Sequence, residues 1–206
     1  MQQEYGRDHI LVVAYHDNLD SYFRISQNRQ RDAYYNRPYR PVAVFDGLEL
    51  LQGGNGNPND VNTYNRYLAA YLRRANVPNR VSITSTFTLD ASTTPRRATL
   101  IAEVEALTDL SQFNGPLRVR FVLYEDNINF RAPNGETHFD WVVRVILPDA
   151  DLTIRQPEES TMLTRSVELN PQWVAQNLGM AVFVQHDPPG NKEVLGAADF
   201  HFPPAN

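Results

Sequence analysis

Few residues in this 206-residue chain are of a type and spacing that could carry out chemistry. The chain contains no cysteine, which excludes thiol catalysis, disulfides and thiolate-bound metals within these residues. His138 and Asp140 lie two residues apart in an alternating segment, so on a strand both would project from one face and could supply two metal ligands. An ordinary solvated strand face explains the same spacing, and we favour that interpretation. We therefore expect no bound metal.

Two further polar pairs follow apolar runs. His16 and Asp17 end one run, at a position where open α/β sheets place ligands, but no nucleophile lies nearby and a capping or packing role is favoured. Glu125 and Asp126 end another, without a second acidic pair to complete a glycosidase dyad. No glycine-rich phosphate loop, Gly-x-Ser-x-Gly elbow or His-Glu-x-x-His motif occurs. The sequence predicts no catalytic residue and no cofactor, and therefore a protein that is not an enzyme.

The most unusual composition lies in residues 22–40, where arginine is interleaved with aromatic residues. Such a segment can anchor a protein interface, bind sugars or stack on nucleic-acid bases. A helix with its aromatic residues packed inward and its arginines in water is the simpler interpretation, and we favour it. If part of the surface binds a partner, this segment is the first candidate. Its candidate residues are Tyr22, Arg24, Arg29, Arg31, Tyr35, Arg37, Tyr39 and Arg40.

Composition and charge restrict the class of protein. A hydrophobic content of 42% excludes a wholly disordered chain. The formal net charge of -5, from 19 basic and 24 acidic residues, disfavours nucleic acid as a partner. No apolar run approaches the roughly 20 residues of a membrane span. The polar start of the sequence, residues 1–8, does not read as a signal peptide.

The first part of the chain mixes strands and helices. The continuous apolar run at residues 9–16 predicts a strand buried on both faces, as in a parallel sheet covered by helices. A helix is expected within residues 20–36. Residues 41–47 predict a second strand, which an Asp-Gly turn joins to a short partner strand at 48–52. The apolar positions of residues 60–75 recur every three to four residues and predict an amphipathic helix.

From residue 79 onward the hydrophobic period changes to two, as expected for half-buried strands. Trp141 shares its parity with Phe139 and Val143, so we expect it and Trp173 to be core residues of the sandwich. Seven short strands separated by turn signals predict an antiparallel β-sandwich of the immunoglobulin-like type. The expected strands are 81–89, 98–106, 117–123, 139–147, 161–169, 179–186 and 192–200.

These segments resemble a known arrangement. The apolar run 11–16, a helix ending at residues 34–36 and the strand 41–47 look like the second half of a thioredoxin-like domain. Pro41 matches the position of that family's cis-proline. The segments 119–128, 138–147 and 180–186 resemble the C-terminal domain of Omp28-related proteins. These are bacterial envelope proteins that join a thioredoxin-like domain to a β-sandwich.

The resemblance implies two domains and one important departure. Residues 1–76 would form a partial thioredoxin-like α/β domain, and residues 79–206 an all-β immunoglobulin-like sandwich. The family's first strand and its Cys-x-x-Cys helix have no counterpart here, so no thiolate of lowered pKa is available. A late or misassigned start, a processed fragment and a strand supplied by another chain would each explain this difference.

The sequence thus predicts a non-catalytic protein of the bacterial cell envelope, periplasmic, on the outer surface or secreted. We expect it to act through protein–protein interaction, as an accessory subunit or a self-assembling component. One alternative is a fragment of a thiol-disulfide oxidoreductase whose Cys-x-x-Cys segment lies upstream. Another is a carbohydrate- or nucleic-acid-binding module that uses the segment 22–40.

Overall fold

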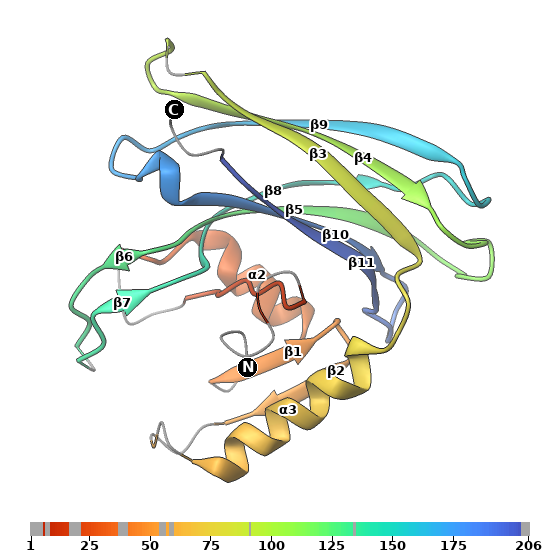
Figure 1. Cartoon of the computed structure of the whole chain (residues 1–206), viewed down its shortest axis with the longest axis horizontal. Helices are drawn as coiled ribbons and strands as arrows, with labels where there is room; N and C mark the ends of the chain where they lie inside the picture. The colour runs from red at the N-terminus through yellow and green to blue at the C-terminus, as the bar shows by residue number, and fades with distance from the viewer. Residues whose placement is uncertain are drawn as a thin grey trace.

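The computed structural model describes residues 6, 9–16, 22–36, 41–53, 57, 60–90, 92–133 and 135–202. Over these residues the chain is mostly β-structure, with two α-helices. Two antiparallel sheets face each other as a sandwich, and the N-terminal segments lie against the outer face of the larger sheet (Figure 1).

The smaller sheet has three strands in the order β3-β4-β9. They are β3 (Val81–Asp90), β4 (Arg97–Ala106) and β9 (Ser160–Glu168), paired antiparallel. Alternate residues of β4, from Ala98 to Ala106, are at most 1% exposed. The period of two in the sequence therefore identified the inward face of this strand correctly.

The larger sheet has four strands in the order β11-β10-β5-β8. They are β5 (Leu117–Glu125), β8 (Val142–Asp151), β10 (Leu178–His186) and β11 (Val194–His201), and every pairing is antiparallel. Together the two sheets contain a strand for each of the seven predicted after residue 79.

The two central strands of the larger sheet, β5 and β10, are buried on both faces. Met180, Val182 and Val184 of β10 point into the sandwich core, whereas Ala181 and Phe183 point the other way. These two belong to an outer-face cluster, whose buried members are Val122, Tyr124, Val143, Ala181 and Phe183. The N-terminal residues packed against this cluster are Leu11, Val13, Tyr15 and Ile25. The sheet is thus a layer shared by the sandwich and the N-terminal region.

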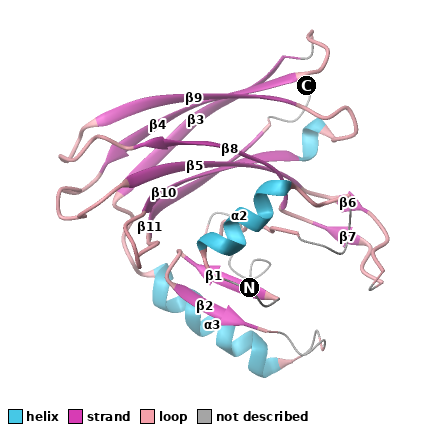
Figure 2. Ribbon diagram, turned by 180° about the vertical axis from the view of Figure 1, so that it is seen from behind, coloured by secondary structure: helices cyan, strands magenta, loops and turns pink. Residues whose placement is uncertain are grey.

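The N-terminal region contains two helices and a hairpin. Helix α2 (Ser26–Tyr34) is followed by β1 (Val42–Phe45), β2 (Glu49–Gln52) and helix α3 (Val61–Ala75). The antiparallel β1–β2 hairpin lies between α2 and α3 (Figure 2). These two helices, the two hairpin strands and their connection match the sequence prediction, with α2 shorter than the segment expected.

The β1–β2 turn has the backbone of a tight primed hairpin turn. Asp46 and Gly47 have φ angles of 45° and 74°, and Leu48 N–H donates to the Phe45 carbonyl at 3.0 Å. This is the conformation that an Asp-Gly pair favours. A Cβ on Gly47 would lie 1.7 Å from the Lys192 carbonyl oxygen, because the turn packs closely on the β10–β11 loop.

Helix α3 is held at both ends. The Asp60 carboxylate accepts two backbone N–H groups of the first turn, as expected of an N-cap residue. In the last turn, Arg74 pairs with Asp46 at 3.0 Å and with Glu193 at 2.9 Å. The second of these ion pairs ties the helix to the sandwich.

Short elements close one end of the larger sheet. β6 (Ile128–Asn129) pairs with β7 (His138–Phe139), and the 3-10 helix η1 (Ala175–Asn177) precedes β10. Phe23 is buried among residues of this hairpin region, with its ring centroid 4.8 Å from that of Phe139. The chain just before α2 is thereby anchored to the sandwich.

The predicted strand at residues 9–16 is wrong. This segment makes a single parallel bridge, between Ala14 and Val142 of β8. In the described part of the chain, β1 pairs with β2 alone, so no parallel sheet encloses the run. Its apolar residues are explained instead by packing on the outer-face cluster.

The predicted environment of Trp141 is also wrong, and that of Trp173 is right. Trp141 lies in the break between β7 and β8, with a φ of 54°, and packs on the outer-face cluster. Its alternation with Phe139 does not continue through this break. Trp173 is partly buried against the sandwich core.

A β-bulge breaks the alternation again two residues later. Leu123 pairs with Val145, but the next residue, Tyr124, pairs with Val143, so Arg144 is an extra residue in β8. Val143 therefore faces the outer cluster and Val145 the sandwich core, although both have the same parity.

The cis-proline prediction stays open. The peptide bond before Pro41 joins it to Arg40, which lies outside the described residues. Among the described residues the cis peptide is Thr94–Pro95.

Candidate functional site

The arginine- and tyrosine-rich segment is divided between surface and interior. Arg24 and Arg29 are exposed and Tyr22 is 42% exposed, whereas Arg31 and Tyr35 are partly buried. The remaining candidates, Arg37, Tyr39 and Arg40, lie outside the described residues. The segment is therefore not one continuous surface over its described part.

Arg31 and Tyr35 attach α2 to the larger sheet. The Arg31 guanidinium lies 4.5 Å from the Tyr34 ring centroid and 4.9 Å from that of Tyr35. The Tyr35 hydroxyl oxygen accepts hydrogen bonds from Arg31 Nη2 and from Gln185 Nε2, both at 3.0 Å. Arg31 thus faces the protein, whereas the favoured interpretation of this helix placed its arginines in water.

A second polar network lies at the same interface. Asp187 accepts hydrogen bonds from Tyr34 at 2.7 Å, Lys192 at 2.6 Å and Arg120 at 2.8 Å. Burial alone would raise the pKa of Asp187, but the hydrogen bonds from Lys192 and Tyr34 and the charge of Arg120 hold that pKa below its ordinary value. Burial and the bond to Asp187 raise the pKa of Tyr34. Asp187 therefore stays ionised and Tyr34 stays protonated, and the hydrogen bond between them holds α2 in place.

The two candidate metal ligands form an exposed pair. His138 Nε2 lies 3.4 Å from Asp140 Oδ2, and the His138 side chain is 51% exposed. Asp140 also accepts the backbone N–H of Asn127 at 2.9 Å. Nowhere in the described ranges do three or more His, Cys, Asp or Glu side chains gather as a metal site.

His16 is placed as a packing residue. Its ring centroid lies 5.2 Å from that of Phe23 and 5.8 Å from that of Phe139. Its carbonyl oxygen accepts a hydrogen bond from the buried Asn28 side chain. The favoured packing role agrees with this environment.

An ion pair joins β5 to β8 beside a pocket that Arg144 lines. Arg144, the extra residue of the bulge, donates from Nε to Glu125 Oε2 at 2.8 Å, and both side chains are 4% exposed. Arg144 Nη1 donates to the Tyr22 carbonyl at 3.1 Å. Glu125 Oε1 accepts the backbone N–H of Val174 at 2.9 Å. The pair therefore joins the sheet to both the N-terminal segment and the loop before β10.

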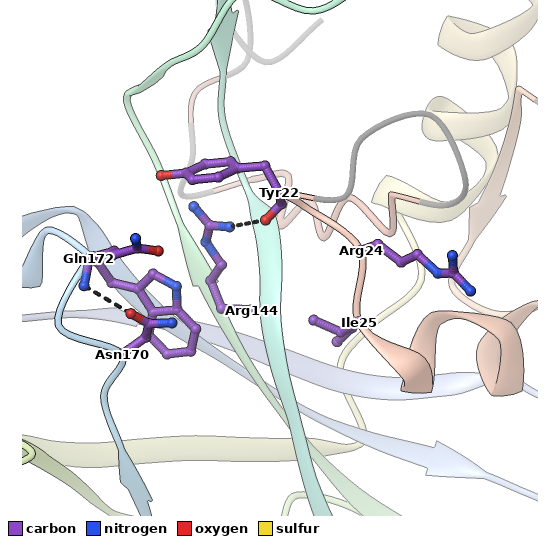
Figure 3. A pocket seen from close by; sticks show the side chains of 7 residues that line it. Tyr22, Arg24, Ile25, Arg144, Asn170 and Gln172 are labelled. Carbon is purple, nitrogen blue, oxygen red and sulfur yellow. Dashed lines mark hydrogen bonds between the residues drawn. The ribbon is translucent and has the colours of Figure 1, made fainter.

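The pocket beside this pair has a volume of about 440 Å³. The Arg144 guanidinium lies 5.0 Å from the Tyr22 ring centroid and 5.9 Å from that of Trp173. Figure 3 shows the Tyr22 ring over the guanidinium, with Asn170 and Gln172 on one side and Arg24 pointing away on the other. The lining residues are Tyr22, Arg24, Ile25, Arg144, Asn170, Gln172 and Trp173.

One polar atom at this site has no hydrogen-bond partner among the described residues. Arg144 Nη2 is buried and unpaired. A buried donor without an acceptor costs free energy, so such an atom calls for an explanation. One explanation is that a bound ligand supplies the acceptor.

Tyr22 and Arg24 are the two lining residues that the sequence pointed to as binding candidates. Glu125 was noted only as half of an acidic pair, Trp173 as a core residue, and Asn170 and Gln172 were not singled out. Arg144 was not singled out either, because the period-two pattern gives no sign of the bulge that turns it inward. The position of Glu125 at the end of a predicted strand was the sequence feature that could have pointed to this site.

Comparison with known proteins shows a fold and no family. No family model and no curated protein matches the sequence. The structure is similar to HBP35 of Porphyromonas gingivalis, with a TM-score of 0.63 and 15% identity over 82% of this chain. The matched region is 55% of that solved structure, so the chain spans about half its length. The chain therefore has an HBP35-like fold.

A second solved structure has too low a similarity to indicate a shared fold. It is a penta-heme cytochrome c552 from Thermochromatium tepidum, with a TM-score of 0.31 and 10% identity over 59% of this chain and 40% of that one. Among the residues described, neither helix has the length and apolar character required to cross a membrane.

Proposed function

We propose that this chain is a non-catalytic protein of the bacterial cell envelope, or a secreted one, that acts by binding another protein. It would serve as an accessory subunit or a self-assembling component. The envelope location rests on the resemblance to Omp28-related proteins.

The arrangement of strands and helices supports the same family. Sheets β3-β4-β9 and β11-β10-β5-β8 face each other as an antiparallel β-sandwich, which supports the immunoglobulin-like type that we propose. A hairpin between two helices is what the second half of a thioredoxin-like domain would contribute. Both kinds of domain commonly present binding surfaces to other proteins.

The observation that carries the proposal is the pocket around Arg144. It lies at the seam between the N-terminal segment and the sandwich and combines Tyr22, Trp173 and two arginines. Tyrosine, tryptophan and arginine are the residue types that dominate binding energy at protein interfaces. With no cysteine in the chain and no metal cluster among the described residues, binding is better supported than catalysis.

Site-specific photo-crosslinking in a bacterium that carries the protein tests this proposal. A benzophenone amino acid replaces Arg24 at the rim of the pocket, and Met162 of β9, which is 69% exposed, is replaced in the control. We expect a discrete adduct with a protein, or with a second copy of this chain, from position 24 and none from position 162. Equal labelling at both positions, or none at either, would contradict a protein-binding site at the seam.

A further inference from the structure

The partner's chemistry follows from the groups that the pocket leaves unsatisfied. Arg144 donates hydrogen bonds from Nε to Glu125 and from Nη1 to the Tyr22 carbonyl. Its remaining nitrogen, Nη2, is the donor that needs an acceptor. The side-chain oxygen of Asn170 accepts the backbone N–H of Gln172 at 2.9 Å, which leaves its Nδ2 to donate (Figure 3). The pocket therefore offers donors to a ligand.

The charges at the pocket favour an anionic ligand. Glu125 pairs with Arg144 at 2.8 Å but does not line the pocket. The lining residues include two arginines and no carboxylate. Arg24 at the rim is exposed and adds a second positive charge. A carboxylate would gain a charge-assisted hydrogen bond from Arg144, which is stronger than a bond to a neutral carbonyl.

The rings of the pocket argue against stacking on a sugar. The Tyr22 ring already stacks on Phe130, with centroids 5.2 Å apart and an interplanar angle of 2°, and it also lies against the Arg144 guanidinium. Recognition here is therefore by hydrogen bonding and charge, and not by stacking on the Tyr22 ring.

We propose that this pocket binds a carboxylate of the partner protein, at its C-terminus or on an acidic side chain, through Arg144 Nη2 and Asn170. This inference rests on the proposed protein-binding function. Because Nη2 is closed off from water under Tyr22, the Tyr22 ring turns aside to admit the carboxylate. Tyr22 is at the surface, so this rotation does not disturb the sandwich core.

Titration calorimetry with small probes tests the inference on the intact chain. N-acetyl-L-leucine carries the carboxylate, N-acetyl-L-leucinamide is its neutral counterpart, and glucuronate is an acidic sugar. We expect the acid to bind at least about tenfold more tightly than the amide, since hydrogen bonds to charged groups contribute more than neutral ones. Equal binding of acid and amide, or no binding of the acid, would overturn the inference. Binding of glucuronate alone would assign the pocket to carbohydrate instead.

Variants locate the bound carboxylate. The double change Glu125→Gln with Arg144→Met removes the donor without leaving an unpaired buried charge, and binding of the acid should fall at least about tenfold. The matched control, Glu49→Gln with Arg73→Met, removes another Arg–Glu pair on α3 and β2 and should bind as the wild type does. If the first double variant does not fold, Asn170→Ala in the exposed loop must weaken binding several-fold.

The two proposals can fail separately. An adduct at position 24 without carboxylate binding would leave a protein-binding surface and remove the carboxylate as its determinant. Unchanged binding in both the Arg144 and the Asn170 variants would place the carboxylate elsewhere and overturn this inference.

Discussion

Arg144 and Glu125 are an uncommon pair for a β-sandwich, because both charges are almost completely removed from water. Their mutual attraction and their hydrogen bonds to the Tyr22 carbonyl and the Val174 N–H compensate the cost of desolvation. Removing one member leaves the other buried and uncompensated, and this asymmetry makes the pair easy to test.

Arg144→Met should lower the free energy of unfolding by about 3–5 kcal/mol, because Glu125 then keeps a buried charge without its partner. Adding Glu125→Gln should restore most of that loss. Urea denaturation at neutral pH measures both effects. If the double variant were no more stable than Arg144→Met alone, the pair would not be the source of the destabilisation.

Asp187 makes the stability of the α2 interface depend on pH. The folded state holds its pKa below the ordinary value of 3.8, so the unfolded chain takes up the proton first as the pH falls. The resulting stabilisation is fully present above pH 3.8 and is lost as the pH falls through the lower pKa of the folded state.

The wild type should therefore exceed Asp187→Asn in stability at pH 7, and the difference should shrink below pH 3.8. Unfolding free energies measured from pH 7 to pH 2.5 give the comparison. Asp151→Asn, at an exposed pair with Arg118, is the control and should change stability little at any pH. A difference at Asp187 that stayed constant down to pH 2.5 would contradict this account.

Among the secondary-structure elements, those with a solvent side were the most predictable. β4 alternates buried and exposed residues, and α3 shows its capping residue and apolar stripe, so both could be located from the sequence. The run 9–16 could not, because an apolar segment laid across a sheet has the composition of a strand within one. The bulge at Arg144 also escaped prediction, since backbone register is set by the partner strand and leaves no mark in side-chain type.

The β1–β2 turn offers a test of how the hairpin is held. Gly47→Ala should destabilise the protein by more than the roughly 1–2 kcal/mol that a left-handed backbone alone costs, because the new methyl group meets the Lys192 carbonyl. Gly53→Ala is the matched control, with a φ of 97° and nothing within 4 Å of the new atom. Thermal denaturation of both variants makes the comparison. Equal losses at the two positions would mean that the turn does not pack against the β10–β11 loop.

The molecule as a whole has two regions by sequence and one continuous set of layers in space. The larger sheet supplies one face to the sandwich core and the other to the N-terminal region, and Arg74 and Asp187 add polar links across the same boundary. Neither region can lose its packing without exposing the sheet. The boundary predicted near residues 76–79 therefore divides the sequence, but we do not expect it to divide the protein into two parts that unfold independently.

We expect a single cooperative unfolding transition. Trp141 packs on the outer-face cluster and Trp173 against the sandwich core, so each reports on a different face of the sheet. In the variants Trp173→Phe and Trp141→Phe, the remaining tryptophan's fluorescence should follow the same urea midpoint as that variant's far-ultraviolet circular dichroism. Separate midpoints within one variant would show two independently stable domains.

Strand β10 has a consequence for how such a sequence can diverge. Its consecutive residues face different layers. Substitutions at Val182 and Val184 must therefore be compatible with the facing sheet, and substitutions at Ala181 and Phe183 must be compatible with the N-terminal segment. Related chains should therefore show two interleaved sets of covarying positions along this one strand. A lineage that lost the N-terminal segment would have to turn every second residue of β10 polar, and its descendants would carry that change as a record of the loss.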